Sequence, residues 1–162
     1  MRPPPAIPPE LNAALKRVAA SYLPAGPERD DLAQEIALAL HLALPQFRGE
    51  SSLRTFALRI AHNVALRHVT RQRARDRRET AEDLERADAT PGPEARLSEK
   101  RSSERLLRAV RALPLSLRAV ITLALEELSG PEISQILGIS ENAVHIRLHR
   151  ARAQLRASLE AT

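Results

Sequence analysis

The side chains best suited to chemistry in this sequence are arginines and histidines close to its C-terminal end. Residues 145–156, HIRLHRARAQLR, contain four arginines and two histidines but no acidic residue. The arginine guanidinium is a planar fork of hydrogen-bond donors that fits phosphate oxygens and the acceptor edge of guanine. This composition indicates recognition of a nucleic acid rather than catalysis.

Catalytic and metal-binding arrangements find little support. The chain has no cysteine, and its five glycines are scattered, so they form no phosphate-binding loop. No Ser-His-Asp set or pair of carboxylates can be argued from spacing alone. His145 and His149 have the four-residue spacing of a zinc site, but no further ligand stands near them in the sequence. We expect no enzyme activity, no metal and no cofactor.

The segment around these side chains has the pattern of a helix-turn-helix. At about 100° per residue, the second helix has one narrow apolar stripe. The stripe consists of Val144, Leu148, Ala151 and Leu155. The preceding PEISQIL gives a second apolar face, Gly138 permits the sharp turn, and Ser140 can cap the second helix. In this layout the second helix enters the DNA major groove.

The side of the second helix opposite the stripe is expected to contact DNA. Arg150 can bind guanine, Asn142 can bind adenine, and Ile146 can contact a thymine methyl group. The full set of expected contacts is Asn142, His145, Ile146, His149 and Arg150. The alternative is an ordinary helical hairpin with a glycine turn, but an outward isoleucine would then have only water as a neighbour.

The elements that carry these side chains are predicted to be all-helical. Aromatic residues are 2% of the chain and alternating strand patterns are missing, whereas Ala, Leu, Arg and Glu favour helix. Charge is segregated along the chain. Residues 67–78 are rich in arginine, acidic residues outnumber basic ones in residues 79–99, and residues 145–156 are basic again. One charged run is usually a solvated helix face, but two basic runs separated by an acidic one make that the weaker explanation here.

Two small helical domains joined by a flexible linker follow from this organisation. We expect a disordered proline-rich tail at 1–8, a first domain at 9–78, an acidic linker at 79–100 and a second domain at 101–162. Within the first domain, helices are predicted over about 9–22, from about Arg29 to Pro45, and over 53–75. Ser51 or Ser52 is placed to cap the third of these.

Two segments taken together resemble a known family. Residues 30–75 carry the motifs D-L-x-Q-E, F-R-G-E-S, R-T-F and I-A-x-N, and residues 113–156 carry L-P, E-I-x-x-x-L-G-I-S and R-A-R-x-x-L. Each motif is weak alone, but the ordered set resembles the bacterial extracytoplasmic-function sigma factors. These are compact sigma factors that keep only conserved regions 2 and 4. Arg54 and Leu58 stand where aromatic residues are frequent in that family.

The resemblance implies a protein that docks on core RNA polymerase and directs promoter recognition and opening. By similarity, the polymerase-binding residues are Asp31, Gln34, Glu35 and Leu38. The residues implied for the minus-10 element, where a base is flipped out of the duplex, are Phe47, Arg48, Ser51, Arg54, Asn63, Arg67 and Arg71. The outward side of the second helix would bind the minus-35 duplex. Most relatives have an anti-sigma factor, so we expect one here.

Two other classes remain as alternatives. A stand-alone helix-turn-helix regulator would use the first domain to dimerise, because such regulators bind paired half-sites. It would have no need of the FRGESSLRTF segment. An enzyme is the third and weakest class. The N-terminal segment lacks the apolar core of a signal peptide, and the longest apolar run is too short to span a bilayer, so we expect a cytoplasmic protein without membrane insertion.

Overall fold

The computed structural model describes residues 3, 5–79 and 98–161, and every regular element in this part of the chain is helical. The first helical unit consists of α1 (Pro9–Tyr22), α2 (Pro27–Ala43), the short 3₁₀ helix η1 (Leu44–Gln46) and α3 (Leu53–Glu79). The second helical unit consists of α4 (Ser98–Ala112), α5 (Leu115–Leu125), α6 (Gly130–Leu137) and α7 (Glu141–Glu160). The all-helical prediction is confirmed.

Proline and serine set the helix boundaries of the first unit. Pro9 and Pro27 occupy the first turns of α1 and α2, where a missing backbone N–H costs nothing. Helix α2 therefore begins two residues earlier than the predicted start near Arg29. The N-terminus of α3 is capped by Ser52, whose hydroxyl accepts from the Thr55 backbone N–H at 3.0 Å.

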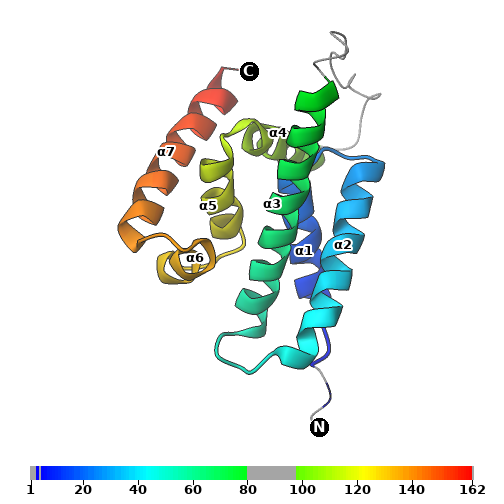
Figure 1. Cartoon of the computed structure of the whole chain (residues 1–162). Helices are drawn as coiled ribbons and strands as arrows, with labels where there is room; N and C mark the ends of the chain where they lie inside the picture. Colours follow the sequence, from blue (N-terminus) through cyan, green and yellow to red (C-terminus); the bar gives the residue numbers. More distant parts are fainter. Residues whose placement is uncertain (1–2, 4, 80–97, 162) are drawn as a thin grey trace.

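Helix α3 is the long central element of the first unit (Figure 1). It packs against both α1 and α2, and it continues through the arginine-rich segment as far as Glu79. Arginine favours helix, and cations near the C-terminus suit the helix dipole. Most of the predicted acidic linker, residues 80–97, lies outside the described residues, and the helix that follows begins at Ser98.

The two units pack against each other instead of standing apart. Helix α1 contacts α4 and α5, and the larger apolar cluster contains residues of both units, such as Leu15 and Val18 of α1 with Val120 and Leu123 of α5. A smaller cluster belongs to α4, α5 and α7, with Val110 and Ala151 at its centre. Figure 1 shows α2 and α7 on opposite outer sides of the molecule. A shared core removes more apolar surface from water than two small units achieve separately.

No helix among the described residues combines the length and apolarity that a bilayer span requires.

Candidate nucleic-acid interface

The turn between α6 and α7 is fixed by local hydrogen bonds. Gly138 adopts the left-handed conformation (φ 65°) and donates its N–H to Ser134 O at 2.9 Å, which closes the C-terminus of α6. Ser140 accepts from the Ala143 N–H at 3.1 Å and caps α7. The Ser129 hydroxyl and the Glu132 carboxylate form a reciprocal capping box at the start of α6. Because both helix ends are closed by short-range bonds, the angle between α6 and α7 is well defined.

Helix α7 separates into a buried and an exposed face, as its spacing predicts. Val144, Ala151 and Leu155 are buried, and Leu148 packs partly buried against both apolar clusters. All the residues expected to contact DNA are exposed: Asn142, His145, Ile146, His149 and Arg150. The side chain of Ile146 is 41% exposed, an apolar group presented to solvent beside arginine and histidine. The predicted two-faced helix is confirmed, and its outward face is exposed to solvent.

Helix α2 presents a second surface on the opposite side of the molecule. Its inward positions Leu32, Ile36 and Leu40 are fully buried, whereas Leu38 and Leu42 are 59% and 65% exposed. The residues expected to bind core polymerase, Asp31, Gln34, Glu35 and Leu38, are all exposed on this helix. Large exposed leucines one turn apart are typical of a protein–protein contact surface.

One residue of this surface is paired with α3. The Glu35 carboxylate lies 3.5 Å from His68 Nδ1 and 3.7 Å from Arg71 Nη2. Glu35 is expected to bind polymerase and Arg71 to bind the minus-10 element, so the structure places members of the two predicted surfaces in contact. Glu35 and Arg71 are both exposed, so each keeps hydrogen-bonding capacity for another molecule.

The loop between η1 and α3 surrounds a hollow. It turns at Gly49, which has a φ of 76°, and the rings of Phe47 and Phe56 are 4.9 Å apart in a tilted arrangement. The hollow is lined by Pro45, Gln46, Phe47, Arg48, Glu50, Ser51, Phe56, Arg59 and Gln135. Three of the residues expected at the minus-10 element, Phe47, Arg48 and Ser51, therefore share one concave site. An aromatic ring beside arginines suits an unpaired base and its phosphates.

Asn63, Arg67 and Arg71 extend this surface along α3. All three are exposed, and the Arg67 side chain donates to Asn63 O at 3.4 Å. Asn63 follows Phe56 by two helical turns, so it lies on the same side of α3, about 10 Å farther along the helix axis. Arg67 and Arg71 lie beside a shallow, largely apolar hollow with Leu66 and Thr70. The expected minus-10 residues thus fall into two groups, one at the loop before α3 and one farther along α3, with Arg54 as the exception.

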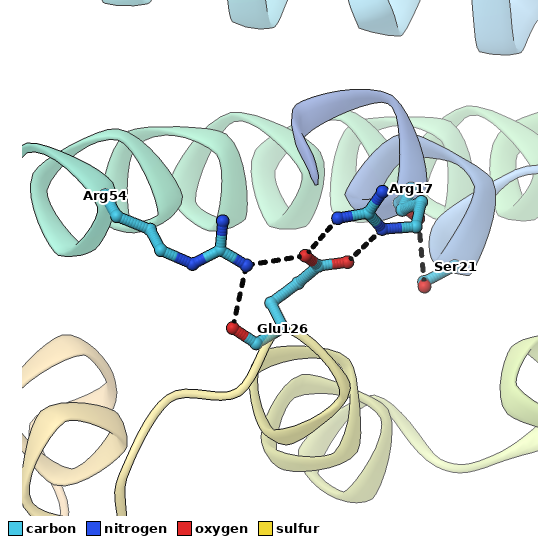
Figure 2. Close-up of polar contacts among 4 residues, drawn as sticks. All are labelled: Arg17, Ser21, Arg54 and Glu126. Atoms are coloured by element: carbon cyan, nitrogen blue, oxygen red, sulfur yellow. Dashed lines mark hydrogen bonds and ion pairs between the residues drawn. The ribbon is translucent and has the colours of Figure 1, made fainter. Parts of the chain in front are cut away.

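Arg54 is held by the second unit. Its Nη2 donates to Glu126 O at 2.9 Å and to Glu126 Oε2 at 3.1 Å. The same carboxylate accepts two bonds of 2.8 Å from Arg17 of α1, one from Nε and one from Nη2, as Figure 2 shows. The Glu126 side chain is only 4% exposed. These bonds raise the pKa of Arg17 above its ordinary value.

Other polar contacts join the two units around this ion cluster. The Thr55 hydroxyl donates to Glu132 Oε1 at 3.1 Å, and Arg111 donates to Ala20 O at 2.9 Å. The Arg118 guanidinium lies 5.8 Å from the centre of the Tyr22 ring. Burial lowers the pKa of Arg118, and the backbone N–H of Ser129 holds the pKa of Glu132 below its usual range.

Sequence reasoning did not predict the pairing of Glu126 with Arg17 and Arg54 across the two units. The capping box was readable from S-x-x-E at Ser129–Glu132, because its bonds join neighbours in the chain. The partners of Glu126 lie 109 and 72 residues away, and no local spacing indicates them. Among the described residues, no group of three or more His, Asp or Glu is placed to hold a metal ion.

Comparison with known proteins agrees with both units. Residues 10–75 match the family model "Sigma-70 region 2", and residues 103–155 match "Sigma-70, region 4". The RNA polymerase sigma factor NccH of Alcaligenes xylosoxydans xylosoxydans is 32% identical over 154 residues, which cover 92% of this chain and 82% of NccH. The ECF RNA polymerase sigma-E factor of Escherichia coli K12 is 31% identical over 140 residues, which cover 81% of this chain and 73% of that protein.

Two solved structures share the fold. A sigma factor from Bartonella quintana, RpoE in complex with the anti-sigma factor NepR, aligns with a TM-score of 0.71 at 21% identity over 93% of this chain and 92% of its own. CnrH, in complex with the cytosolic domain of CnrY, aligns with a TM-score of 0.64 at 29% identity over 94% of this chain and 84% of its own.

Proposed function

Because this chain belongs to the extracytoplasmic-function family of RNA polymerase sigma factors and directs promoter recognition by that enzyme, we propose that its two helical units bind separate elements of one promoter. The first unit takes the minus-10 element and the polymerase core, and the second takes the minus-35 element. The protein acts as a specificity subunit and catalyses no reaction of its own. We infer that the protein acts in the cytoplasm, together with RNA polymerase.

The observation that carries the minus-35 assignment is the exposed face of α7. Arg150 and Asn142 can donate to base edges, and Ile146 supplies an apolar surface for a thymine methyl group. The capped N-terminus of α7 adds backbone N–H groups and the positive end of the helix dipole for a phosphate. Arg147 and Arg152 on the same helix contribute further positive charge toward the DNA backbone.

The minus-10 assignment is supported by the hollow beside Phe47 and by exposed residues farther along α3. A base that leaves the duplex loses its stacking, and an enclosed aromatic surface offsets this loss. Phe47 supplies the ring, and Arg48 and Ser51 supply donors at the edge of the hollow. Farther along α3, the exposed side chains that would contact the next nucleotides of the melted DNA strand are Asn63, Arg67 and Arg71.

Core polymerase binding is assigned to the exposed face of α2. Leu38 and Leu42 provide apolar area, and Asp31, Gln34 and Glu35 surround it with polar groups. An apolar centre with a polar rim is the usual composition of a protein–protein interface. The α7 face remains exposed on the opposite outer side of the molecule, where it is free to bind DNA (Figure 1).

We also propose a protein inhibitor for this chain. RpoE of Bartonella quintana is solved with the anti-sigma factor NepR, and CnrH with the cytosolic domain of CnrY. An anti-sigma factor that competes for the α2 face would compete with polymerase.

Run-off transcription tests the proposed function. Purified core RNA polymerase is mixed with the full chain and a library of promoter fragments from the organism that carries this gene. The expected result is a set of discrete transcripts that require both proteins. If the chain instead binds paired half-sites as a dimer without polymerase and gives no transcript, it is a stand-alone regulator.

A further inference from the structure

We propose that Arg17 and Arg54 form a phosphate-binding site for promoter DNA, and that Glu126 occupies this site while the two helical units are closed on each other. The inference rests on the proposed function, because it names a new contact of the first unit with the DNA strand. Its new member is Arg17, which belongs to none of the expected DNA-binding or polymerase-binding sets.

The first argument is the chemistry of the cluster. Two arginines from different helices converge on one carboxylate, Arg17 through both Nε and Nη2, and Arg54 through Nη2. A carboxylate and a phosphate present acceptor oxygens that fit the same guanidinium fork. Arg17 and Arg54 are 55% and 36% exposed, whereas Glu126 is almost fully buried between them. The anion is thus supplied by the second unit, and the cations stay on the surface of the first.

The second argument is the distance between promoter elements. Elements centred at positions minus 10 and minus 35 are about 25 base pairs apart, or roughly 85 Å of duplex at about 3.4 Å per base pair. A folded chain of this length has a radius of gyration of about 15 Å. The closed arrangement cannot place the first unit on one element and α7 on the other. Binding the promoter therefore requires the two units to separate.

The third argument is that separation of the units leaves Arg17 and Arg54 without their carboxylate partner. Glu126 follows directly after α5 and moves away with the second unit, while Arg17 stays on α1 and Arg54 on α3. Two neighbouring cations then lose their shared counterion and become available to another anion. Arg54 stands at the start of α3, directly after the loop proposed to hold the flipped base. Gln135 of α6 also lines the hollow of that loop, so separation exposes both features together.

The experiment measures closure and DNA binding in the same full-length protein. The chain has no cysteine, so Ala37→Cys on α2 and Ala157→Cys on α7, both exposed, accept a fluorescent donor and acceptor. Energy transfer reports closure. The DNA probe is an oligodeoxythymidine strand of about 20 nucleotides, titrated over a range of salt concentrations. Each phosphate neutralised on a single strand contributes about 0.7 to the slope of log K against log salt.

The Glu126→Gln variant is expected to lose energy transfer and to bind the strand more tightly, with a slope steeper by about 1.4 for two freed arginines. The triple variant Glu126→Gln, Arg17→Gln, Arg54→Gln is expected to be equally open but to show no steeper slope than wild type. Glu127→Gln is the matched control: Glu127 is the neighbouring exposed carboxylate, and it acts on Arg17 only through its charge. It makes the same change of net charge and should leave the chain closed.

Three results would overturn the inference. They are unchanged energy transfer in Glu126→Gln, a slope no steeper than that of Glu127→Gln, or a gain in slope that persists in the triple variant. If circular dichroism shows that Glu126→Gln does not fold, Arg17→Gln is used instead, because it breaks the same ion pair at an exposed residue. It should open the chain and steepen the slope by about 0.7, for Arg54 alone, and an open chain with the wild-type slope would refute the site.

The run-off assay separates this inference from the proposed function. Wild type that directs transcription, with no opening in Glu126→Gln, overturns the inference and leaves the proposed function standing. Wild type that directs no transcription, with opening and the steeper slope in Glu126→Gln, overturns the proposed function and supports the Arg17–Arg54 site as a nucleic-acid site.

Discussion

The Tyr22 hydroxyl lies 3.1 Å from Nδ1 of His62, and both side chains are buried between α1 and α3. Burial raises the pKa of the Tyr22 phenol, so this group stays protonated within its hydrogen bond to the His62 ring. Burial also lowers the pKa of His62 from 6.5 to about 4, since a charged imidazolium loses its hydration there. The folded protein therefore holds His62 neutral well below neutral pH.

Stability is expected to fall as the solution is acidified from about pH 6.5 toward pH 4. In this window the unfolded chain binds a proton at His62 and the folded chain does not, so each step toward acid favours the unfolded state. The complete shift corresponds to about 3 kcal/mol. Urea unfolding at about pH 7 and about pH 4.5 measures most of this change. A His62→Gln variant should show a smaller loss over the same interval, and an equal loss in both proteins would contradict this assignment.

Replacing Arg150 by alanine is expected to weaken promoter-specific binding by about 1–3 kcal/mol and to relax the preference at one base of the minus-35 element. The reason is loss of a guanidinium that can bind two acceptors of a guanine. Binding of the reconstituted holoenzyme to single-base variants of the element measures this. Arg156→Ala, an exposed arginine nearly two turns farther along α7, is the matched control. An unchanged base preference in Arg150→Ala would reject the role.

Replacing Asn63 by alanine is expected to leave the closed complex intact and to impair promoter opening. Asn63 is exposed on α3, two turns from Phe56 at the hollow, so the variant should lose the proposed contact to the melted strand without disturbing the core. Permanganate reactivity of unpaired thymines measures opening, and a mobility shift measures the closed complex. Asn12→Ala, an exposed asparagine on α1, should melt the promoter as wild type does. Normal thymine reactivity in Asn63→Ala would count against the contact.

Replacing Leu38 by aspartate is expected to abolish co-elution with core RNA polymerase. The side chain is 59% exposed, so the charge should not unfold α2, and far-ultraviolet circular dichroism should stay helical. A charge placed in the apolar centre of an interface is buried without a partner when the complex forms. Leu125→Asp puts the same charge on a 47% exposed leucine of the second unit and should still co-elute. Co-elution of Leu38→Asp would show that the polymerase binds elsewhere.

Spacing along the chain was sufficient to predict the features that depend on near neighbours. The stripe of Val144, Ala151 and Leu155 and the outward position of Ile146 follow from the helical repeat alone. Gly138 and Ser140 end one helix and begin the next through bonds that span only a few residues. These are local properties, and the structure agrees with them.

Contacts between distant segments could not be predicted in the same way. Glu126 and Glu127 are adjacent and chemically identical, yet Glu126 is buried against Arg17 and Glu127 is exposed with a φ of 62°. Which of the two glutamates is buried depends on how α5 packs against α1, and no sequence repeat indicates that packing geometry. The family resemblance implies a DNA contact for Arg54, whereas its partner in the closed chain is Glu126, 72 residues farther along.

The smaller apolar cluster draws its buried residues only from positions 109–155. Separating the first unit from α5 would remove the packing of Val120 and Leu123 against α1, whereas Val110, Ile121 and Ala151 would keep the packing of the smaller cluster. Amide protons around Val110 and Ala151 should then exchange with solvent no faster in an opened chain than in the closed one. The second unit would then reach the minus-35 element already folded, and its structure would not depend on what the first unit binds.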